Sequence, residues 1–442
     1  MGSVARRTLL LIVVLAAFLA FPTSAVGFSG FGSMTASATF GGQMRFSVDL
    51  PGGPPDRLEL LLRFASSPDS TVVAPVDPGA TSAVYVWDTA DRPLTPNTQI
   101  AYRWRATNGD AVTLSPEKTL LYDDDRPGLD WHVAKIGLAT VHWYGGAEAQ
   151  ARHFGAISAD AAAAAETLLG HDLVGPIDIF VYDSREDFFG VLGPGAREWT
   201  GAATFPSLRT IFMWLGGGSS AYLETTMTHE VTHVVFQDAT ANPFHDPAKW
   251  FNEGLAVWSE RQTASGHEGS VQAAADAGSL LAFDGIAESF PIGDQAARLS
   301  YDEGATMVQM IIDTYGRDAI AAIAAAWRDG AGDAEALQAG TGVTAQKLYE
   351  AYFASFGAQP PTAVEPVPIP ASNVDKPPQP AASTDEVPAS SAPASASPVE
   401  EPSGSSGDAS GWILGGVVVA GLGLGVGVAI VARRRRAPAG HP

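Results

Sequence analysis

The sequence contains no cysteine, and its basic residues are few. Its 442 residues include 26 Lys and Arg against 48 Asp and Glu, which gives a formal net charge of −22. The lack of cysteine excludes both a disulfide framework and a cysteine-ligated metal site. The acidic balance leaves no basic stripe to neutralise phosphates, so we expect no nucleic-acid partner. The length suggests about two or three domains, and 46% of the residues are hydrophobic, which is ample for packed cores.

Both ends of the chain are hydrophobic, with different meanings. Residues 1–25 place two arginines before an apolar run and end on small residues, which predicts a secretory signal peptide. Residues 411–432 are apolar and uncharged over about the length that spans a bilayer. Four arginines follow at once, so residues 433–442 read as a cytoplasmic tail. We therefore expect a C-terminal transmembrane helix at 411–432, in contact with the lipid bilayer; a buried core helix is the alternative.

Residues 359–410 are rich in Pro, Ala and Ser and contain no aromatic residue. Such a segment cannot bury enough surface to offset its ordering entropy, so it is predicted to be a disordered linker. With the signal peptide and the membrane span, this predicts a single-pass protein of the cell membrane whose main part lies outside the cell.

Residues 26–124 show the alternation of apolar and polar side chains that is typical of strands. Met44, Phe46 and Val48 would share one face of a strand, and Asn108-Gly109 predicts a hairpin turn. Short strands divided by Gly and Pro turns indicate a small all-β sandwich. The run at 94–102 resembles the corner of fibronectin type III modules, so the sandwich is expected to be Ig/fibronectin III-like. It would serve as a structural cap or as a substrate-docking spacer.

Residues 128–358 mix strands and helices. The patterns predict helices at 148–169, 221–238 and 251–262, strands at 177–182 and 204–214, and an almost wholly helical stretch over 301–356. A mixed sheet followed by helices is an α+β layout.

The most informative stretch is His229-Glu230-Val231-Thr232-His233. Residues four apart lie on one face of a helix, so His229 and His233 can aim two imidazoles at one point. Glu230 lies one position round the helix, within reach of a water at that point. Glu253 in the next predicted helix can supply a third ligand. This predicts a catalytic Zn2+ site, one ion per chain, with an open position for water; a solvated helix with two ordinary histidines is the alternative.

The proposed chemistry is metal-assisted hydrolysis of a peptide or protein substrate. Zinc lowers the pKa of a water towards neutral and polarises the carbonyl. Glu230 takes the proton as the water attacks, then returns it to the leaving amine.

The two segments HEVTH and WFNEGLAVWSE resemble those of the gluzincin zinc metallopeptidases, in particular the peptidase MA-like family. The resemblance covers roughly residues 130–357. It implies a zincin-like fold with His229, His233 and Glu253 as zinc ligands and Glu230 as the general base. It also implies that a strand before the first helix pairs with the substrate backbone, at 201–205 or 209–214.

The sequence departs from the aminopeptidases of this group in one segment. These enzymes carry a Gly-x-Met-x-Asn segment at the cleft, which residues 201–205 do not match. An endopeptidase is therefore expected rather than an aminopeptidase. Nineteen residues separate His233 from Glu253, one more than in those aminopeptidases, which shifts the subgroup and not the chemistry.

Two further residues are candidates for supporting roles. Tyr301, expected just before a helix, is the candidate catalytic donor to the oxyanion, with a packing tyrosine as the alternative. Glu260 follows Glu253 by seven residues and so shares its helical face. It can accept a hydrogen bond from a ligand histidine as a second-shell group, or take part in a surface ion pair.

Other function classes stay open at this point. The chain could be a non-enzymatic surface binding protein with a structural or vestigial zinc site. The presence of Glu230 argues against this, because a structural site needs no base. An aminopeptidase, or zinc hydrolysis of a bond other than a peptide, are the remaining alternatives.

Overall fold

The computed structural model describes residues 28–65, 69–90, 94–192, 201–260, 265–291 and 293–361. The chain divides between Leu129 and Asp130 into two compact units. The expected signal peptide, the tail and all but the first three residues of the expected linker lie outside the described residues.

The expectation of a transmembrane helix is corrected. Across the residues that the structure describes, every helix is too short or too polar to cross a membrane. The segment 411–432, which suggested a membrane span, lies outside those residues. The described part of the chain is therefore an α+β unit preceded by β-sheets.

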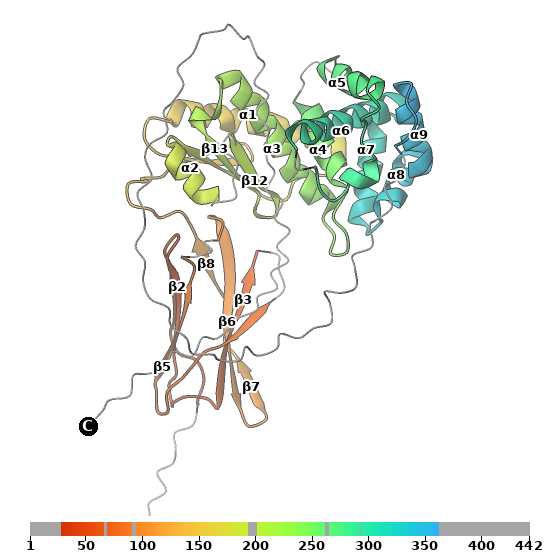
Figure 1. The fold of residues 1–442 in the computed structure, drawn as a ribbon. Helices are drawn as coiled ribbons and strands as arrows, with labels where there is room; N and C mark the ends of the chain where they lie inside the picture. Colours follow the sequence, from red (N-terminus) through yellow and green to blue (C-terminus); the bar gives the residue numbers. More distant parts are fainter. Residues whose placement is uncertain are drawn as a thin grey trace, which may run out of the picture. The chain divides into compact units, whose positions relative to one another are not determined.

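The first unit is built from two antiparallel sheets (Figure 1). One has the order β1-β2-β5; the other has the order β4-β3-β6-β7, with β8 also paired with β6. The strands are β1 (Met34–Ala38), β2 (Gln43–Asp49), β3 (Arg57–Phe64), β4 (Ser70–Val73), β5 (Ser82–Asp88), β6 (Thr98–Asn108), β7 (Ala111–Leu114) and β8 (Lys118–Tyr122). Alternate residues of β2 and β6, such as Phe46 and Trp104, are buried in one shared core. The predicted hairpin turn is present, with Gly109 at a φ of +53° between β6 and β7.

The second unit contains a five-stranded sheet of order β12-β13-β11-β10-β9. Its strands are β9 (His132–Ile136), β10 (Ala139–Trp143), β11 (Ile177–Tyr182), β12 (Ala202–Phe205) and β13 (Thr210–Trp214). The central strands β10, β11 and β13 run parallel, while the outer strands β9 and β12 are antiparallel to their neighbours. The sheet thus ends, on the β12 side, at a short antiparallel edge strand.

Helices cover both faces of this sheet. Ile179 of β11 points into the core that α1 (Glu148–Leu169) and α3 (Ser220–Thr240) build on one face. On the other face Tyr182 contacts Phe188 of α2 (Arg185–Leu192), edge to face with ring centroids 6.1 Å apart. Buried β-strands with apolar side chains on both faces are what a sheet between two helical layers requires.

The remaining helices form one group beside the sheet (Figure 1). They are α4 (Lys249–Ser259), α5 (Ser265–Asp276), α6 (Asp294–Tyr315), α7 (Arg317–Arg328), α8 (Asp333–Thr341) and α9 (Ala345–Ser355), with the short 3-10 helices η1 (Pro206–Leu208), η2 (Leu215–Gly217) and η3 (Phe283–Ile286). Helix α4 packs between α3 and α6. That position brings its side chains to the face of α3 that carries the two histidines.

Two sequence predictions within this unit are wrong in detail. The strand expected at 204–214 is two strands, because Pro206 opens a 3-10 turn and Arg209 adopts a left-handed φ of 50° between β12 and β13. Tyr301 does not precede a helix, because α6 begins at Asp294 and places Tyr301 inside the helix.

Candidate metal centre

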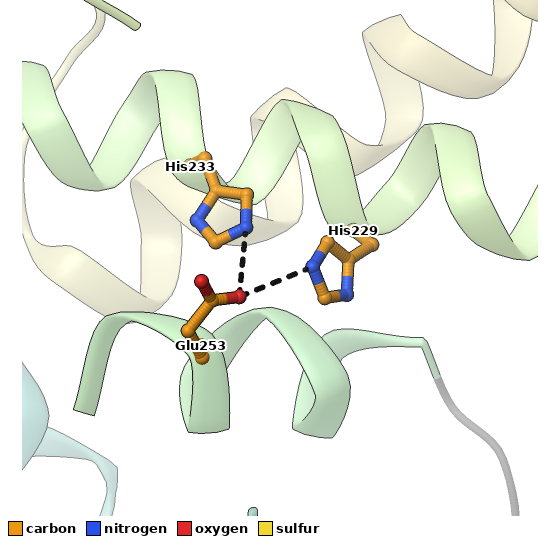
Figure 2. A group of neighbouring side chains, drawn as sticks. All are labelled: His229, His233 and Glu253. Atoms are coloured by element: carbon orange, nitrogen blue, oxygen red, sulfur yellow. Dashed lines mark ion pairs between the residues drawn. The ribbon is translucent and has the colours of Figure 1, made fainter. Parts of the chain in front are cut away.

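Two neighbouring helices supply the candidate site. Helix α3 begins at a side-chain cap, in which Ser219 accepts a hydrogen bond from the backbone N–H of Tyr222. The four-residue spacing then turns His229 and His233 to the same side of α3. Glu253 reaches towards them from α4, so that the three side chains face one another across the gap between the helices (Figure 2).

The three side chains converge on one point. Glu253 Oε2 lies 3.7 Å from His229 Nε2 and 3.5 Å from His233 Nε2. One ligand atom from each residue falls within 4.8 Å of the other two. All three residues are buried, with at most 1% of their surface exposed. A compact set of two imidazoles and one carboxylate is the donor set of a catalytic zinc site.

Each histidine is oriented by a partner on α4 or at its end. His229 Nδ1 donates to Glu260 Oε1 at 2.7 Å, and His233 Nδ1 donates to Asn252 Oδ1 at 2.8 Å. With Nδ1 of each ring engaged in this way, the other ring nitrogen, Nε2, faces Glu253. Such partners fix the tautomer and the direction of a metal-ligating imidazole.

The atoms that face the point of convergence have no hydrogen-bond partner. Among the described residues, His229 Nε2, His233 Nε2 and Glu253 Oε2 are all buried, and none of them has a hydrogen-bond partner. A buried polar atom without a partner costs on the order of 1–3 kcal/mol, so three of them at one point favour a bound ligand there. The residues present therefore fit a metal ion held by two nitrogens and one oxygen.

Glu230 lies next to this point and belongs to no hydrogen bond within the described part of the chain. Its side chain is fully buried. Burial raises the pKa of Glu230, and the two imidazoles and the Thr204 hydroxyl lower it only in part. A buried carboxylate with a raised pKa beside a metal set is the arrangement of a general base.

The charges around the site favour a cation. Burial alone would lower the pKa of His229, but the Glu253 and Glu260 carboxylates outweigh it and raise that pKa to about 10. Burial likewise works to raise the pKa of Glu253, but both imidazoles hold it well below its usual range. His229 thus keeps a proton on its imidazole, and Glu253 keeps a negative charge on its carboxylate. A bound metal ion would take the place of that proton.

The structure brings together five of the six residues singled out in the sequence. His229, His233 and Glu253 meet between α3 and α4 (Figure 2), Glu260 pairs with His229, and Glu230 interacts electrostatically with both imidazoles and Glu253. Tyr301 packs its ring edge-on against Phe290, with ring centroids 5.0 Å apart. Its role as the oxyanion donor therefore stays a prediction.

Three neighbours of the site were not found from the sequence. They are Asn252 on His233, Thr204 near Glu230, and Lys249, whose Nζ lies 3.5 Å from Glu253 Oε1. Of the three, only Lys249 could have been predicted from the sequence, because its four-residue spacing to Glu253 places both on one helical face. The partnerships of Asn252 and Thr204 join distant segments, so local patterns do not carry them.

The strand beside the site is β12. Of the two segments considered for substrate pairing, residues 209–214 form β13, which is paired on both sides by β11 and β12. Within the described sheet, β12 stands at the end of the order and packs against α3. Of the two segments, 201–205 therefore contains the strand with the free edge.

A cavity of about 550 Å³ lies on another side of Glu260. It is lined by apolar residues of α1, by Thr228 and Thr232 of α3 and by Trp258 of α4, but by none of the three ligands. The candidate metal centre is therefore separate from this cavity, and Glu260 borders both.

Residues 157–357 match the model of a family described as the Peptidase MA superfamily. A search of curated proteins found no match.

Among solved structures, an M1 zinc metallopeptidase from Deinococcus radiodurans is similar over 78% of this chain and 98% of its own, at 12% identity and a TM-score of 0.32. Legionella pneumophila aminopeptidase A in complex with aspartic acid is similar over 72% of this chain and 47% of its own, at 10% identity and a TM-score of 0.33. A carbohydrate-binding module family 56 beta-1,3-glucan binding domain covers 21% of this chain and 99% of its own, at 15% identity and a TM-score of 0.17. At TM-scores this low, the structural likenesses carry no weight for the function.

Proposed function

Because residues 157–357 belong to the peptidase MA superfamily and the protein is a metallopeptidase, we propose that it cleaves internal peptide bonds at the centre formed by His229, His233 and Glu253. One observation carries the proposal. The buried atoms His229 Nε2, His233 Nε2 and Glu253 Oε2 lack hydrogen-bond partners and lie close to one another, and the Glu230 carboxylate, also without a partner among the described residues, interacts electrostatically with all three residues. A structural metal site has no use for such a base.

The donor set favours zinc. His229 Nε2, His233 Nε2 and Glu253 Oε2 would hold the ion, and two imidazoles with one carboxylate suit Zn2+ well. When bound, zinc supplies a Lewis acid that polarises a carbonyl and lowers the pKa of a water. Glu260 and Asn252 keep the imidazoles aimed through their Nδ1 atoms.

Glu230 is the proposed general base. Its carboxylate takes a proton from the attacking water and delivers it to the leaving nitrogen of the peptide. Burial keeps water other than the reactant away from this carboxylate, so the proton stays within the reacting groups. Tyr301 is the proposed donor to the developing oxyanion.

The edge strand β12 is a second observation in favour of a peptide substrate. An extended peptide can add to a free edge through backbone hydrogen bonds, which requires no particular side chain. The segment that holds β12 lacks the Gly-x-Met-x-Asn pattern, which favours an endopeptidase over an aminopeptidase. A chain bound along an edge strand also continues past the scissile bond in both directions.

The proposed place of action is outside the cell. It rests on the composition of residues 1–25, with two arginines before an apolar run. A fusion of these residues to a reporter enzyme that is active only after export tests it. A reporter retained inside the cell would contradict this part of the proposal.

The function is tested with the purified protein and Glu230→Gln. We expect about one zinc per chain in both proteins by elemental analysis, and a loss of peptide cleavage of at least a hundredfold, on the order expected for a general base, in Glu230→Gln only. Glu224→Gln changes a surface residue of the same helix and should leave cleavage unchanged.

Two peptide libraries separate the modes of cleavage. An endopeptidase cleaves N-acetylated and free peptides at the same internal bonds, whereas an aminopeptidase requires the free amine. A protein that binds no zinc, or a Glu230→Gln variant that cleaves as fast as the unaltered protein, would overturn the proposed function.

A further inference from the structure

A lysine stands at the metal centre without a role in the proposed reaction. Lys249 opens α4 one turn before Glu253, and its Nζ lies 3.5 Å from Glu253 Oε1. Side chains four residues apart meet on one face of a helix. The Lys249 side chain is 29% exposed, whereas the carboxylate it meets is buried. The lysine thus brings its charge from the rim of the site to a ligand.

Lys249 is held in this position from two other directions. Its backbone N–H donates to the carbonyl of Ala287, which fixes the first turn of α4. Its ammonium lies over the ring of Phe290, 5.4 Å from the ring centroid. A cation over an aromatic face is attracted by the ring. The ammonium is therefore confined between the Phe290 ring and the Glu253 carboxylate.

This contact makes the two oxygens of Glu253 different. Oε2 faces both imidazoles and has no hydrogen-bond partner among the described residues, while Oε1 faces the ammonium of Lys249. A carboxylate free at both oxygens can bind a metal through one or both. Zinc in a catalytic site keeps one position for water, which a second carboxylate oxygen would compete for.

We infer that Lys249 is a positioning residue that engages Oε1 of Glu253, so that Glu253 offers zinc Oε2 alone. The inference rests on the proposed zinc site. It assigns Lys249 a second effect as well, because its positive charge partly offsets the carboxylates of Glu230 and Glu253 in a site with little water to screen them. Neither effect requires Lys249 to touch the substrate.

The test compares Lys249→Met, Lys249→Arg and Lys347→Met in the full chain. Zinc affinity is measured by competition with a chromophoric chelator, and the coordination number is read from the visible spectrum of the Co2+-loaded protein. We expect Lys249→Met to bind zinc roughly tenfold more tightly, because the positive charge beside the ligands is gone and Glu253 Oε1 is free to bind the metal as well. Its Co2+ bands should also weaken, as the coordination number rises. Lys249→Arg should keep both close to those of the unaltered protein, and Lys347→Met, at an exposed position of α9, should change neither.

The outcomes separate this inference from the proposed function. If the unaltered protein binds no zinc, the proposed function fails and the inference fails with it. If it binds zinc and Lys249→Met matches it in affinity and Co2+ spectrum, only the inference is overturned. A raised KM with unchanged metal binding would also overturn it, since Lys249 would then bind the substrate. Lys249→Ala gives the same readout should Lys249→Met lose its helical circular dichroism.

Discussion

Two buried carboxylates of the candidate site lack hydrogen-bond partners for oxygens that other buried carboxylates, such as Glu59, have satisfied. Glu59 is also buried, but Arg105 and Arg57 both donate to its carboxylate, so nothing remains for it to bind. Glu230 and Glu253 each present buried oxygen without a partner in the described chain. Since folding does not tolerate many such groups, those that persist at one place indicate a site where a ligand completes them.

Glu303 gives a test of this reasoning away from the metal ligands. It is buried in α6, its Oε1 accepts the backbone N–H of Leu281 at 2.9 Å, and Oε2 has no partner in the described chain. Burial, with a smaller contribution from the Asp302 carboxylate, raises its pKa from 4.5 to about 8. The folded protein therefore keeps a proton that the unfolded chain loses above about pH 4.5. The contribution of Glu303 to the free energy of unfolding is therefore fully present below pH 4.5, and it is lost as the pH rises towards 8.

We expect Glu303→Gln to remove this loss. The amide stays neutral, so the variant should exceed the unaltered protein in unfolding free energy by roughly 1–3 kcal/mol at pH 7, and the difference should vanish near pH 4. Chemical unfolding at a series of pH values measures it. Glu350→Gln, at an exposed position of α9, removes the same charge and serves as the control. Equal stabilities at pH 7 would mean that Glu303 ionises freely in the fold.

At the scale of secondary-structure elements, the site depends on how closely α4 approaches α6. Gly254 follows the candidate ligand Glu253, and a Cβ added to it would lie 2.3 Å from the carbonyl carbon of Gly304 in α6. The reverse contact is as tight, with a Cβ on Gly304 2.4 Å from the Trp250 carbonyl oxygen. Two backbones in direct contact leave no room for a methyl group. The glycine after the ligand therefore sets the distance between the two helices.

Gly254→Ala should push α4 and α6 apart. We expect a loss of roughly 1–3 kcal/mol in unfolding free energy, as for other overpacked sites, together with weaker zinc binding, because Glu253 moves with its helix. Urea unfolding and chelator competition measure the two effects. Gly269→Ala is the matched control, since a methyl group there meets nothing within 4 Å in helix α5. If Gly254→Ala were as stable as Gly269→Ala, the close contact would not constrain the helices.

At the scale of the whole molecule, the two units have separate cores. The buried apolar residues of the first unit form one cluster and those of the second unit form another, and the two clusters share no residue. The candidate metal ligands all belong to the second unit. Units with their own cores unfold as separate cooperative blocks, and a ligand stabilises only the block that binds it.

Calorimetry of the full chain should show two unfolding transitions. Zinc at a hundredfold excess over its dissociation constant should stabilise one block by about 3 kcal/mol and leave the other transition in place. Removal of zinc with a chelator should reverse the shift. In His229→Ala neither transition should move on adding zinc, which controls for nonspecific effects of the metal. A common shift of both transitions would show that the units unfold together.

Much of the fold follows from local patterns. The helix at 148–169 and the strand at 177–182 occur with the predicted bounds, because long alanine-rich and short β-branched runs have little choice of structure. The local pattern does not predict that the strand expected at 204–214 is interrupted, because a single proline and one left-handed residue, Arg209, outweigh the apolar run around them. The membrane span was wrong, because composition alone suggested it and no described helix has the required length and hydropathy.

The sequence by itself determined the candidate reactive set. His229, Glu230 and His233 lie within one helical turn, where the period of the helix fixes their relative directions, and Glu253 follows in a segment of matching chemistry. Only the tertiary structure decided what surrounds them: that Asn252 orients His233, that Lys249 meets the second oxygen of Glu253, and that β12 forms the edge beside α3. The physical reason is one of range. A helix dictates spacing over a few residues, whereas partners from separate strands and helices meet only when the whole core packs.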